Sequence, residues 1–259
     1  MFPLKDNIPT DRLPIVTIAL IVANVLVYFL WQKGGLSFGD PSGEHYLTHL
    51  AKYGAVPFEL THPGRDCGYE VVGNVIDASR FTCTGTFYPA DQPAWWITPF
   101  TAMFMHGGLL HLGGNMLFLW IFGNNVEDAM GRVKFILFYV LGGLAAMAAQ
   151  TAMGPSAAVP TLGASGAIAA VLGGYILLWP RARVLTLIFI VFFFTIVEIP
   201  ALLVLGVWFL LQIWDASSAQ AGSGGVAYFA HVGGFVFGLL AIKAFAQRVK
   251  SAPPRLPSF

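Results

Sequence analysis

The chain carries few charged residues for its length. Only 10% of its 259 residues are Asp, Glu, Lys or Arg, whereas soluble domains carry about 25%. The net charge is +1 and no basic stripe is present, which argues against nucleic acid as a partner. Because 56% of the residues are hydrophobic, the composition excludes an ordinary water-soluble core and indicates a membrane protein.

The apolar residues lie in blocks of about 17–25 residues, the length that a bilayer core about 30 Å thick requires of a helix. A cleaved signal peptide would need a shorter apolar region and a small-residue cleavage site, and neither is evident near the start. The blocks predict five spans, at 14–31, 107–123, 135–153, 162–179 and 226–246.

The apolar segment 184–214 needs a different interpretation. One straight helix would be too long for the bilayer core, and two spans of about 14 residues would each be too short. Glu198 and Pro200 interrupt the segment, so we expect the first half to lie along the interface or re-enter and the part after Pro200 to cross. The predicted fold is therefore an all-α membrane bundle of six transmembrane helices.

The basic residues predict the orientation of this bundle. Six spans place both termini and the connections 124–134 and 180–183 on one face, with Lys5, Arg12, Arg132, Lys134, Arg181, Arg183, Arg248, Lys250 and Arg255. The connections 154–161 and 215–225 contain no Lys or Arg. By the positive-inside rule, residues 1–13 and 248–259 are cytoplasmic and flank a membrane domain at 14–247, whose long first loop, 32–106, is extracytoplasmic.

This long loop contains both cysteines, Cys67 and Cys83. Outside the cytoplasm a disulfide between them is chemically permitted, although two cysteines alone do not establish it. His45 and His49 have the i, i+4 spacing of metal ligands on one helix face. Without the acidic partner of an H-E-x-x-H pattern, a solvated loop is the better interpretation. We expect neither a metal nor an organic cofactor.

Polar residues inside the predicted spans need a reason, because an unpartnered polar group is costly in the membrane. With six spans, four of them share one outer layer roughly 5–12 Å below the outer helix starts: His111, Asn115, Ser165 and His231. Two spans across 184–214 would place His231 at the opposite face from Ser165. The other polar residues within spans are Thr17, Asn24, Glu198 and Gln212.

A serine and a histidine at one depth are the minimum for nucleophilic catalysis. A neutral imidazole can accept the hydroxyl proton during attack and then protonate the leaving amine. His111 and Asn115, one helical turn apart, can both donate to the developing oxyanion, and one such donor contributes about 3–4 kcal/mol in the transition state. Each residue alone also has a structural interpretation, as a packing residue or as a hydrogen bond between helices.

Small residues accompany both candidate catalytic residues. Gly234 and Gly238 form a G-x-x-x-G face below His231, while Ala169 and Gly173 follow Ser165 at four and eight residues. Such faces allow two helix backbones to approach closely, which would bring short side chains within hydrogen-bond distance. The serine is not in the G-x-S-x-G elbow of soluble hydrolases, because position 167 is alanine.

Four segments together resemble the rhomboid intramembrane serine proteases: "HGGLLHLGGNM" at 106–116, "VEDAMG" at 126–131, "GASG" at 163–166 and "AHVGGFVFG" at 230–238. Their order, spacing and placement match over nearly the whole chain from the first span onward. The resemblance implies a bacterial-type, six-span rhomboid-like bundle. It also implies an endopeptidase that cleaves peptide bonds in or next to transmembrane helices of single-span or multi-span membrane-protein substrates.

The resemblance also implies residue roles. Ser165 would be the nucleophile and His231 its general base and acid, in a dyad without a third acid. His111, Asn115 and the backbone N–H of Ser165 would form the oxyanion hole. The region around Pro200 and the segment 217–225 would correspond to a mobile gate helix and a capping loop. Structural support would come from Gly163, Gly166, Glu127, Gly131, Gly234 and Gly238.

The chain departs from the family pattern in two places. Residues 95–100 read "WWITPF", without the arginine of the Trp-Arg pair that many relatives carry in the first outer loop. Ala169 stands where some relatives place an aromatic residue that holds the histidine ring. The first departure concerns the packing of the outer loop and the second the means of orienting His231.

Two other functional classes are open. A transporter or channel would need a continuous polar path, whereas these polar residues stop in the outer half of the spans. A non-catalytic chaperone or scaffold of rhomboid-like fold would keep the architecture without the chemistry.

The protease interpretation is accompanied by an expected location, a prokaryotic plasma membrane, with the site open to the extracytoplasmic side. Substrate helices should carry small or helix-breaking residues near the outer surface, because an extended strand must enter a shallow site.

Overall fold

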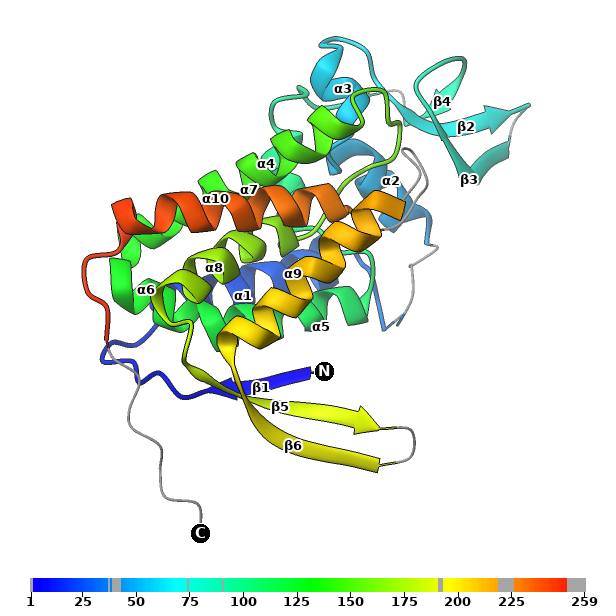
Figure 1. Cartoon of the computed structure of the whole chain (residues 1–259). Helices are drawn as coiled ribbons and strands as arrows, with labels where there is room; N and C mark the ends of the chain where they lie inside the picture. The colour runs from blue at the N-terminus through cyan, green and yellow to red at the C-terminus, as the bar shows by residue number, and fades with distance from the viewer. Residues whose placement is uncertain are drawn as a thin grey trace.

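The computed structural model describes residues 2–36, 38, 43–73, 75–89, 91–190, 193–218 and 226–250. Within these ranges a bundle of helices carries a smaller subdomain at one end and a sheet along one flank (Figure 1). The bundle is built from α1 (Ile15–Leu26) with the π-helical turn η1 (Val27–Trp31), α5 (Leu109–Phe118) with η2 (Leu119–Gly123) and α6 (Asn124–Met130), α7 (Arg132–Met153), α8 (Ser165–Leu178), α9 (Ala201–Ser218) and α10 (Tyr228–Phe245).

Two of these helices, α7 and α10, are long and apolar enough to cross a membrane. Three further apolar helical segments are shorter: Ile15–Trp31, Ser165–Leu178 and Ala201–Ser217. The second predicted span, 107–123, is observed to continue through η2 into α6 as far as Met130. The described helices therefore follow the predicted apolar blocks, with different ends.

Helices α7, α8 and α10 pack closely because small residues face one another. All residues of α8 from Gly166 to Ile176 are buried, as expected of a helix that is apolar on every side. A Cβ atom on Gly234 would collide with the carbonyl oxygen of Gly166, and one on Gly238 with that of Ala170. These two glycines therefore permit backbone contact between α8 and α10.

The expectation of an all-α fold is wrong, because the described residues contain two antiparallel three-stranded sheets. The strands β5 (Arg183–Ile190) and β6 (Phe193–Pro200) form a hairpin, and β1 (Phe2–Asp6) pairs with the other edge of β5. The segment is rich in Val, Ile, Thr and Phe, which favour strands. The interruption at Pro200 is confirmed, since α9 begins at Ala201.

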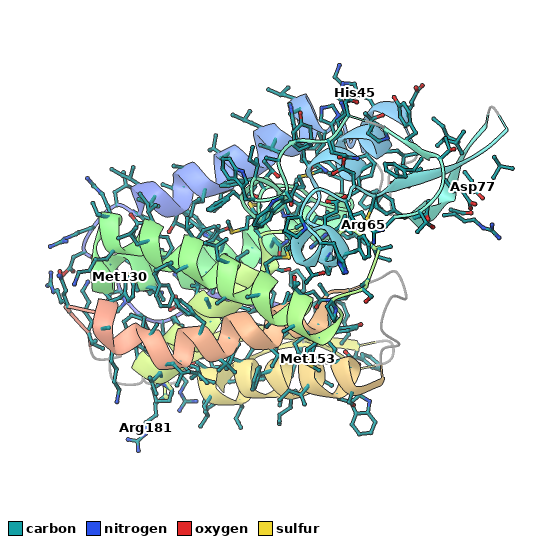
Figure 2. All side chains as sticks on the ribbon, turned by 90° about the horizontal axis from the view of Figure 1, so that it is seen from above. His45, Arg65, Asp77, Met130, Met153 and Arg181 are labelled. Carbon is teal, nitrogen blue, oxygen red and sulfur yellow. A yellow bond between two sulfur atoms is a disulfide. The ribbon has the colours of Figure 1, made fainter. Side chains whose placement is uncertain are left out.

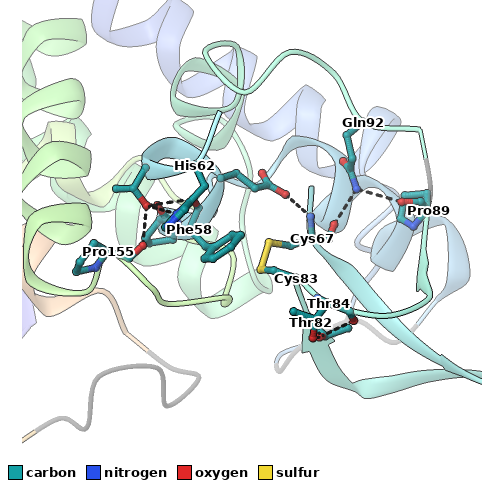
Figure 3. The surroundings of a disulfide bond; sticks show 12 residues. Phe58, His62, Cys67, Thr82, Cys83, Thr84, Pro89, Gln92 and Pro155 are labelled. Carbon is teal, nitrogen blue, oxygen red and sulfur yellow. Dashed lines mark hydrogen bonds between the residues drawn. A yellow bond between two sulfur atoms is a disulfide. The ribbon is translucent and has the colours of Figure 1, made fainter. Parts of the chain in front are cut away.

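The long loop between the first two helical segments folds into the subdomain at one end of the bundle (Figure 1). It contains α2 (Glu44–Tyr53), α3 (Pro57–Thr61), a sheet in the order β3 (Val75–Thr82), β2 (Gly68–Val72), β4 (Phe87–Tyr88), and then α4 (Thr98–Ala102). A disulfide joins Cys67 to Cys83 next to this sheet (Figure 3). The N–H of Cys67 donates to the buried Glu59 carboxylate at 2.8 Å.

The opposite end of the bundle brings the segment before α1 next to the segment after α10. Lys250 Nζ lies 2.7 Å from Asp11 Oδ1 and 3.0 Å from Asp128 Oδ2, and the indole N–H of Trp179 donates to the Lys250 carbonyl at 2.7 Å. In Figure 2, Met130 and Arg181 lie at this end, whereas His45, Arg65 and Asp77 lie at the subdomain end.

Glu127 on α6 supports the start of α1. Its Oε1 accepts the N–H of Val16 at 3.0 Å, and its Oε2 accepts both the N–H and the hydroxyl of Thr17 at 2.8 Å. Because α1 follows Pro14 without a side-chain cap of its own, this carboxylate satisfies donors that the first turn leaves free. Gly131, which joins α6 to α7, has a φ of +80°, a value that favours glycine.

Several predicted segments include residues outside the described ranges: residue 1 of the segment 1–13, residues 37, 39–42, 74 and 90 of the loop 32–106, and residues 191–192 of the segment 184–214. Residues 219–225 of the predicted capping loop 217–225 and residues 251–259 of the predicted tail 248–259 also lie outside the described ranges.

Candidate active site

Ser165 is the first residue of α8. The first hydrogen bond of this helix runs from the Ile168 N–H to the Ala164 carbonyl at 2.9 Å, so the N–H of Ser165 belongs to the first turn, at the positive end of the helix dipole. Gly163 has a φ of +119° and its N–H donates to the Ala102 carbonyl at 2.9 Å. The glycine thus allows the sharp entry that presents the serine at the helix start.

His231 is the fourth residue of α10, and its Nε2 lies 2.8 Å from Ser165 Oγ. The imidazole is buried. The contacts of Gly234 and Gly238 with the α8 backbone hold the two helices at the separation that this hydrogen bond needs. The structure therefore brings together the serine and the histidine that the sequence singles out.

The second nitrogen of His231 also has a partner. Its Nδ1 lies 2.6 Å from Oε1 of Gln212 on α9. The Trp208 ring, one turn earlier on α9, lies with its centroid 5.8 Å from that of the imidazole. The sequence shows Gln212 as a polar residue within a span, but sequence reasoning missed its partner, because no local pattern links positions 212 and 231.

His111 on α5 is held in a definite tautomer. Its Nδ1 accepts the N–H of Gly107 at 3.3 Å, so the neutral ring carries its proton on Nε2. That edge of the ring faces Gly163: a Cβ atom there would lie 2.8 Å from both Cε1 and Nε2 of His111, and 3.5 Å from Ser165 Oγ. An N–H donor of His111 is thus directed toward the entry of α8.

Asn115 follows His111 by one turn of α5, on the same helix face. Its side chain is buried, and its Nδ2 makes no hydrogen bond with any described residue. A buried amide donor without a partner is costly in a folded chain. It is therefore available to a ligand or to an oxyanion.

A small cavity of about 20 Å³ lies beside Ser165. A cavity of this size holds little more than one water-sized group. Its lining is mostly apolar and includes Ala102, Met103, Gly143, Ala146, Met147 and Gly166.

The subdomain at the end of the bundle holds the segment that leads to Ser165, and sequence reasoning missed this role. Ala55 and Thr161 exchange two backbone hydrogen bonds, at 3.0 and 2.8 Å. The Thr61 hydroxyl donates to the Pro155 carbonyl at 2.7 Å, beside the α3 residues drawn in Figure 3. The partners are far apart in the sequence, and no local sequence pattern links them.

His45 and His49 on α2 stack on each other with ring centroids 4.3 Å apart, and Nδ1 of His49 lies 2.8 Å from the His45 carbonyl. Across the described ranges, no group of three His, Cys, Asp or Glu side chains is placed to hold a metal. The Trp31 ring packs against the same pair, with its centroid 4.5 Å from that of His49.

The fold and the site define a class: a bundle of apolar helices with a buried serine–histidine pair near one end. The Rhomboid domain family matches residues 93–248, and the chain belongs to the rhomboid family, whose members are helical integral membrane proteins.

The chain is similar to rhomboid proteins from yeast, a bacterium and a plant, among others. The chain is 33% identical over 233 residues to Rhomboid protein 1, mitochondrial, of Saccharomyces cerevisiae, across 85% of this chain and 62% of the yeast protein. It is 38% identical over 84 residues to Rhomboid protease GluP of Bacillus subtilis, across 32% and 15%. It is 30% identical over 139 residues to Rhomboid-like protein 11, chloroplastic, of Arabidopsis thaliana, across 52% and 44%. The chain thus spans less than two thirds of these relatives.

Proposed function

We propose that the protein is an intramembrane serine endopeptidase that cleaves peptide bonds in or next to transmembrane helices of other membrane proteins. The observation that carries this proposal is the 2.8 Å contact between Ser165 Oγ and His231 Nε2. Membership of a family that includes a relative named as a protease supports it.

In the proposed mechanism, Ser165 Oγ attacks the scissile carbonyl carbon while His231 Nε2 takes the hydroxyl proton. The imidazolium then gives this proton to the leaving amine, and the acyl-enzyme is hydrolysed by water with the same histidine as base. The tetrahedral oxyanion accepts hydrogen bonds from Nε2–H of His111, Nδ2–H of Asn115 and the backbone N–H of Ser165. The tautomer of His111 and the unpartnered amide of Asn115 support these roles.

The proposed substrates are helices with small or helix-breaking residues near the outer surface. The cavity beside Ser165 favours a small side chain, and the substrate backbone must leave its helix to reach the serine. Cleavage of a poly-leucine span as rapidly as a span containing Gly and Pro would contradict this proposal.

We propose six crossings, with residues 1–13 and 248–259 cytoplasmic, a membrane domain at 14–247 and the loop 32–106 outside, in a prokaryotic plasma membrane. The contact between Asp11, which precedes α1, and Lys250, which follows α10, supports an even number of crossings. The disulfide supports an oxidising side for the outer loop. Alkaline phosphatase inserted in that loop should be active, and fused after Lys250 it should be inactive; the reverse pattern contradicts the topology.

A serine-directed fluorophosphonate tests the catalytic proposal. The wild-type protein should be labelled, and Ser165→Ala and His231→Ala should not. A folded wild-type protein that resists labelling would instead support a non-catalytic scaffold. Incubation with a single-span substrate, followed by mass spectrometry of the products, would then locate the cleaved bond.

A further inference from the structure

We propose that Gln212 is a positioning residue for His231. Its amide oxygen fixes the imidazole in the tautomer that presents an unprotonated Nε2 to Ser165. This inference rests on the proposed proteolytic function and assigns a third participant to the serine–histidine pair.

Each ring nitrogen of His231 has one hydrogen-bond partner. Gln212 Oε1 lies 2.6 Å from Nδ1, and Ser165 Oγ lies 2.8 Å from Nε2. A neutral imidazole donates through one nitrogen and accepts through the other. Because a carbonyl oxygen can only accept, Gln212 requires the proton on Nδ1, and Nε2 is then free to take the serine proton.

The surroundings of Gln212 fix its position. The side chain is buried, and Phe209 on the same helix stacks on Phe235 of α10 with ring centroids 4.2 Å apart. The Trp208 ring adjoins His231 from the same helix. Helix α8 offers only a methyl group one turn after Ser165, because position 169 is alanine. The groups that orient the imidazole therefore come from α9.

A neutral amide suits this position in a membrane protein. A buried carboxylate without a cationic partner would be costly whenever the imidazole is neutral. The amide oxygen accepts a hydrogen bond from the neutral ring and also from the imidazolium that forms during attack. The titratable side chain that faces His231 from another element is His111 on α5.

Gln212→Met tests the proposal, because methionine has a similar length but no acceptor for the ring N–H. We expect kcat to fall about 10–100-fold with KM nearly unchanged. The acid limb of the kcat–pH profile should move to lower pH, because the imidazolium loses its acceptor. Gln212→Glu keeps the acceptor and adds charge, so it should recover much of the rate and move the acid limb to higher pH.

Gln150→Met is the matched control. Gln150 Oε1 on α7 accepts the N–H of Ala230 at 3.1 Å, next to His231 but not on its ring. Loss of this bond should loosen α10 and lower the unfolding temperature without moving the acid limb. ¹⁵N spectra of labelled histidines, with the His231 signal assigned from His231→Ala, should show a protonated Nδ1 in the wild type and in Gln150→Met, and a changed tautomer ratio in Gln212→Met.

The outcomes separate the two proposals. A wild-type protein that neither cleaves substrate nor reacts with fluorophosphonate overturns the proposed function itself. An active wild type together with a folded Gln212→Met variant of unchanged kcat, acid limb and ¹⁵N spectrum overturns only the role of Gln212. Should Gln212→Met fail to fold, Gln212→Asn provides the decision: its shorter side chain withdraws the oxygen from Nδ1, and wild-type values in that variant refute the inference.

Discussion

The carboxylate of Glu127 should stabilise the bundle through the first turn of α1. It accepts three hydrogen bonds, two from the N–H groups of Val16 and Thr17 and one from the Thr17 hydroxyl. All three residues are buried, so water cannot replace the carboxylate without rearrangement. Removal of the acceptor leaves these donors unsatisfied. The cost in the free energy of unfolding depends on the number of unsatisfied donors.

A graded series of variants follows from these three bonds. Thr17→Val removes the hydroxyl bond alone and should cost about 1 kcal/mol in the free energy of unfolding. Glu127→Gln keeps the volume, but its NH₂ group faces a donor and the charge is lost, so we expect about 2–3 kcal/mol. Glu127→Ala removes every acceptor and leaves a cavity, for about 4 kcal/mol. For a chain of this size that corresponds to roughly 8–16 °C in the unfolding temperature.

Thermal unfolding in detergent measures this series, and a double-mutant cycle tests its cause. Thr17→Val should cost much less in the Glu127→Ala background than in the wild type, because its partner is already absent. Ser165 lies at the start of α8, at the opposite end of the bundle from Glu127. Fluorophosphonate labelling of folded variants in the cold should therefore stay near the wild-type rate. An unchanged unfolding temperature for Glu127→Ala, or fully additive costs, would refute the capping role.

Three other perturbations give distinct outcomes. Gly163→Ala adds backbone strain of about 1–3 kcal/mol and displaces the His111 ring, so fluorophosphonate labelling should slow about 100-fold or more, whereas a wild-type rate would contradict the geometry. Burial raises the pKa of Glu59 from 4.5 to about 7, so the folded chain binds more protons than the unfolded chain between these values. Stability should therefore fall as the pH rises from 4.5 to 7, by up to about 3 kcal/mol; Glu59→Gln should abolish this fall, which unfolding temperatures at pH 5 and pH 8 would reveal. Gly238→Ala pushes against the carbonyl oxygen of Ala170 and should cost about 1–3 kcal/mol and slow labelling; equal stability would show that α8 and α10 can separate freely.

Sequence reasoning paired Ser165 with His231 because membrane depth constrains polar residues strongly. Ser165 and His231 share a layer only in a six-span arrangement, and the structure places their side chains in contact. Glycine spacing predicted the close approach of two helices, which the contacts of Gly234 and Gly238 explain atom by atom. Helix ends were harder to predict: the polar run after the second span joins its helix because Glu127 and Asn125 find partners on other segments.

The strands could not be predicted from periodicity. Residues 184–200 are apolar at nearly every position, and a continuous apolar run does not distinguish a strand from a helix. The abundance of β-branched and aromatic residues was the available signal. The pairing of β1 with β5 joins residues 2–6 to 184–187, a contact that no local pattern encodes. The partners of Gln212 and of Thr161 are missing from the sequence prediction for the same reason.

In the proposed mechanism, the direction of the helices helps the site to stabilise negative charge. Ser165, His111 and His231 lie within the first four residues of α8, α5 and α10. If the chain starts in the cytoplasm, these three helices are the second, fourth and sixth crossings, so all three run inward and point their N-termini at the outer layer. Helix N-termini carry partial positive charge and free N–H groups, which favour an oxyanion. In the same proposed arrangement, the odd-numbered crossings present their C-termini to this layer. One of them, α9, supplies an acceptor, Gln212, to the nitrogen of His231 that does not contact the serine. The proposed donors for the oxyanion and the proposed acceptor for the imidazolium thus come from helices of opposite direction.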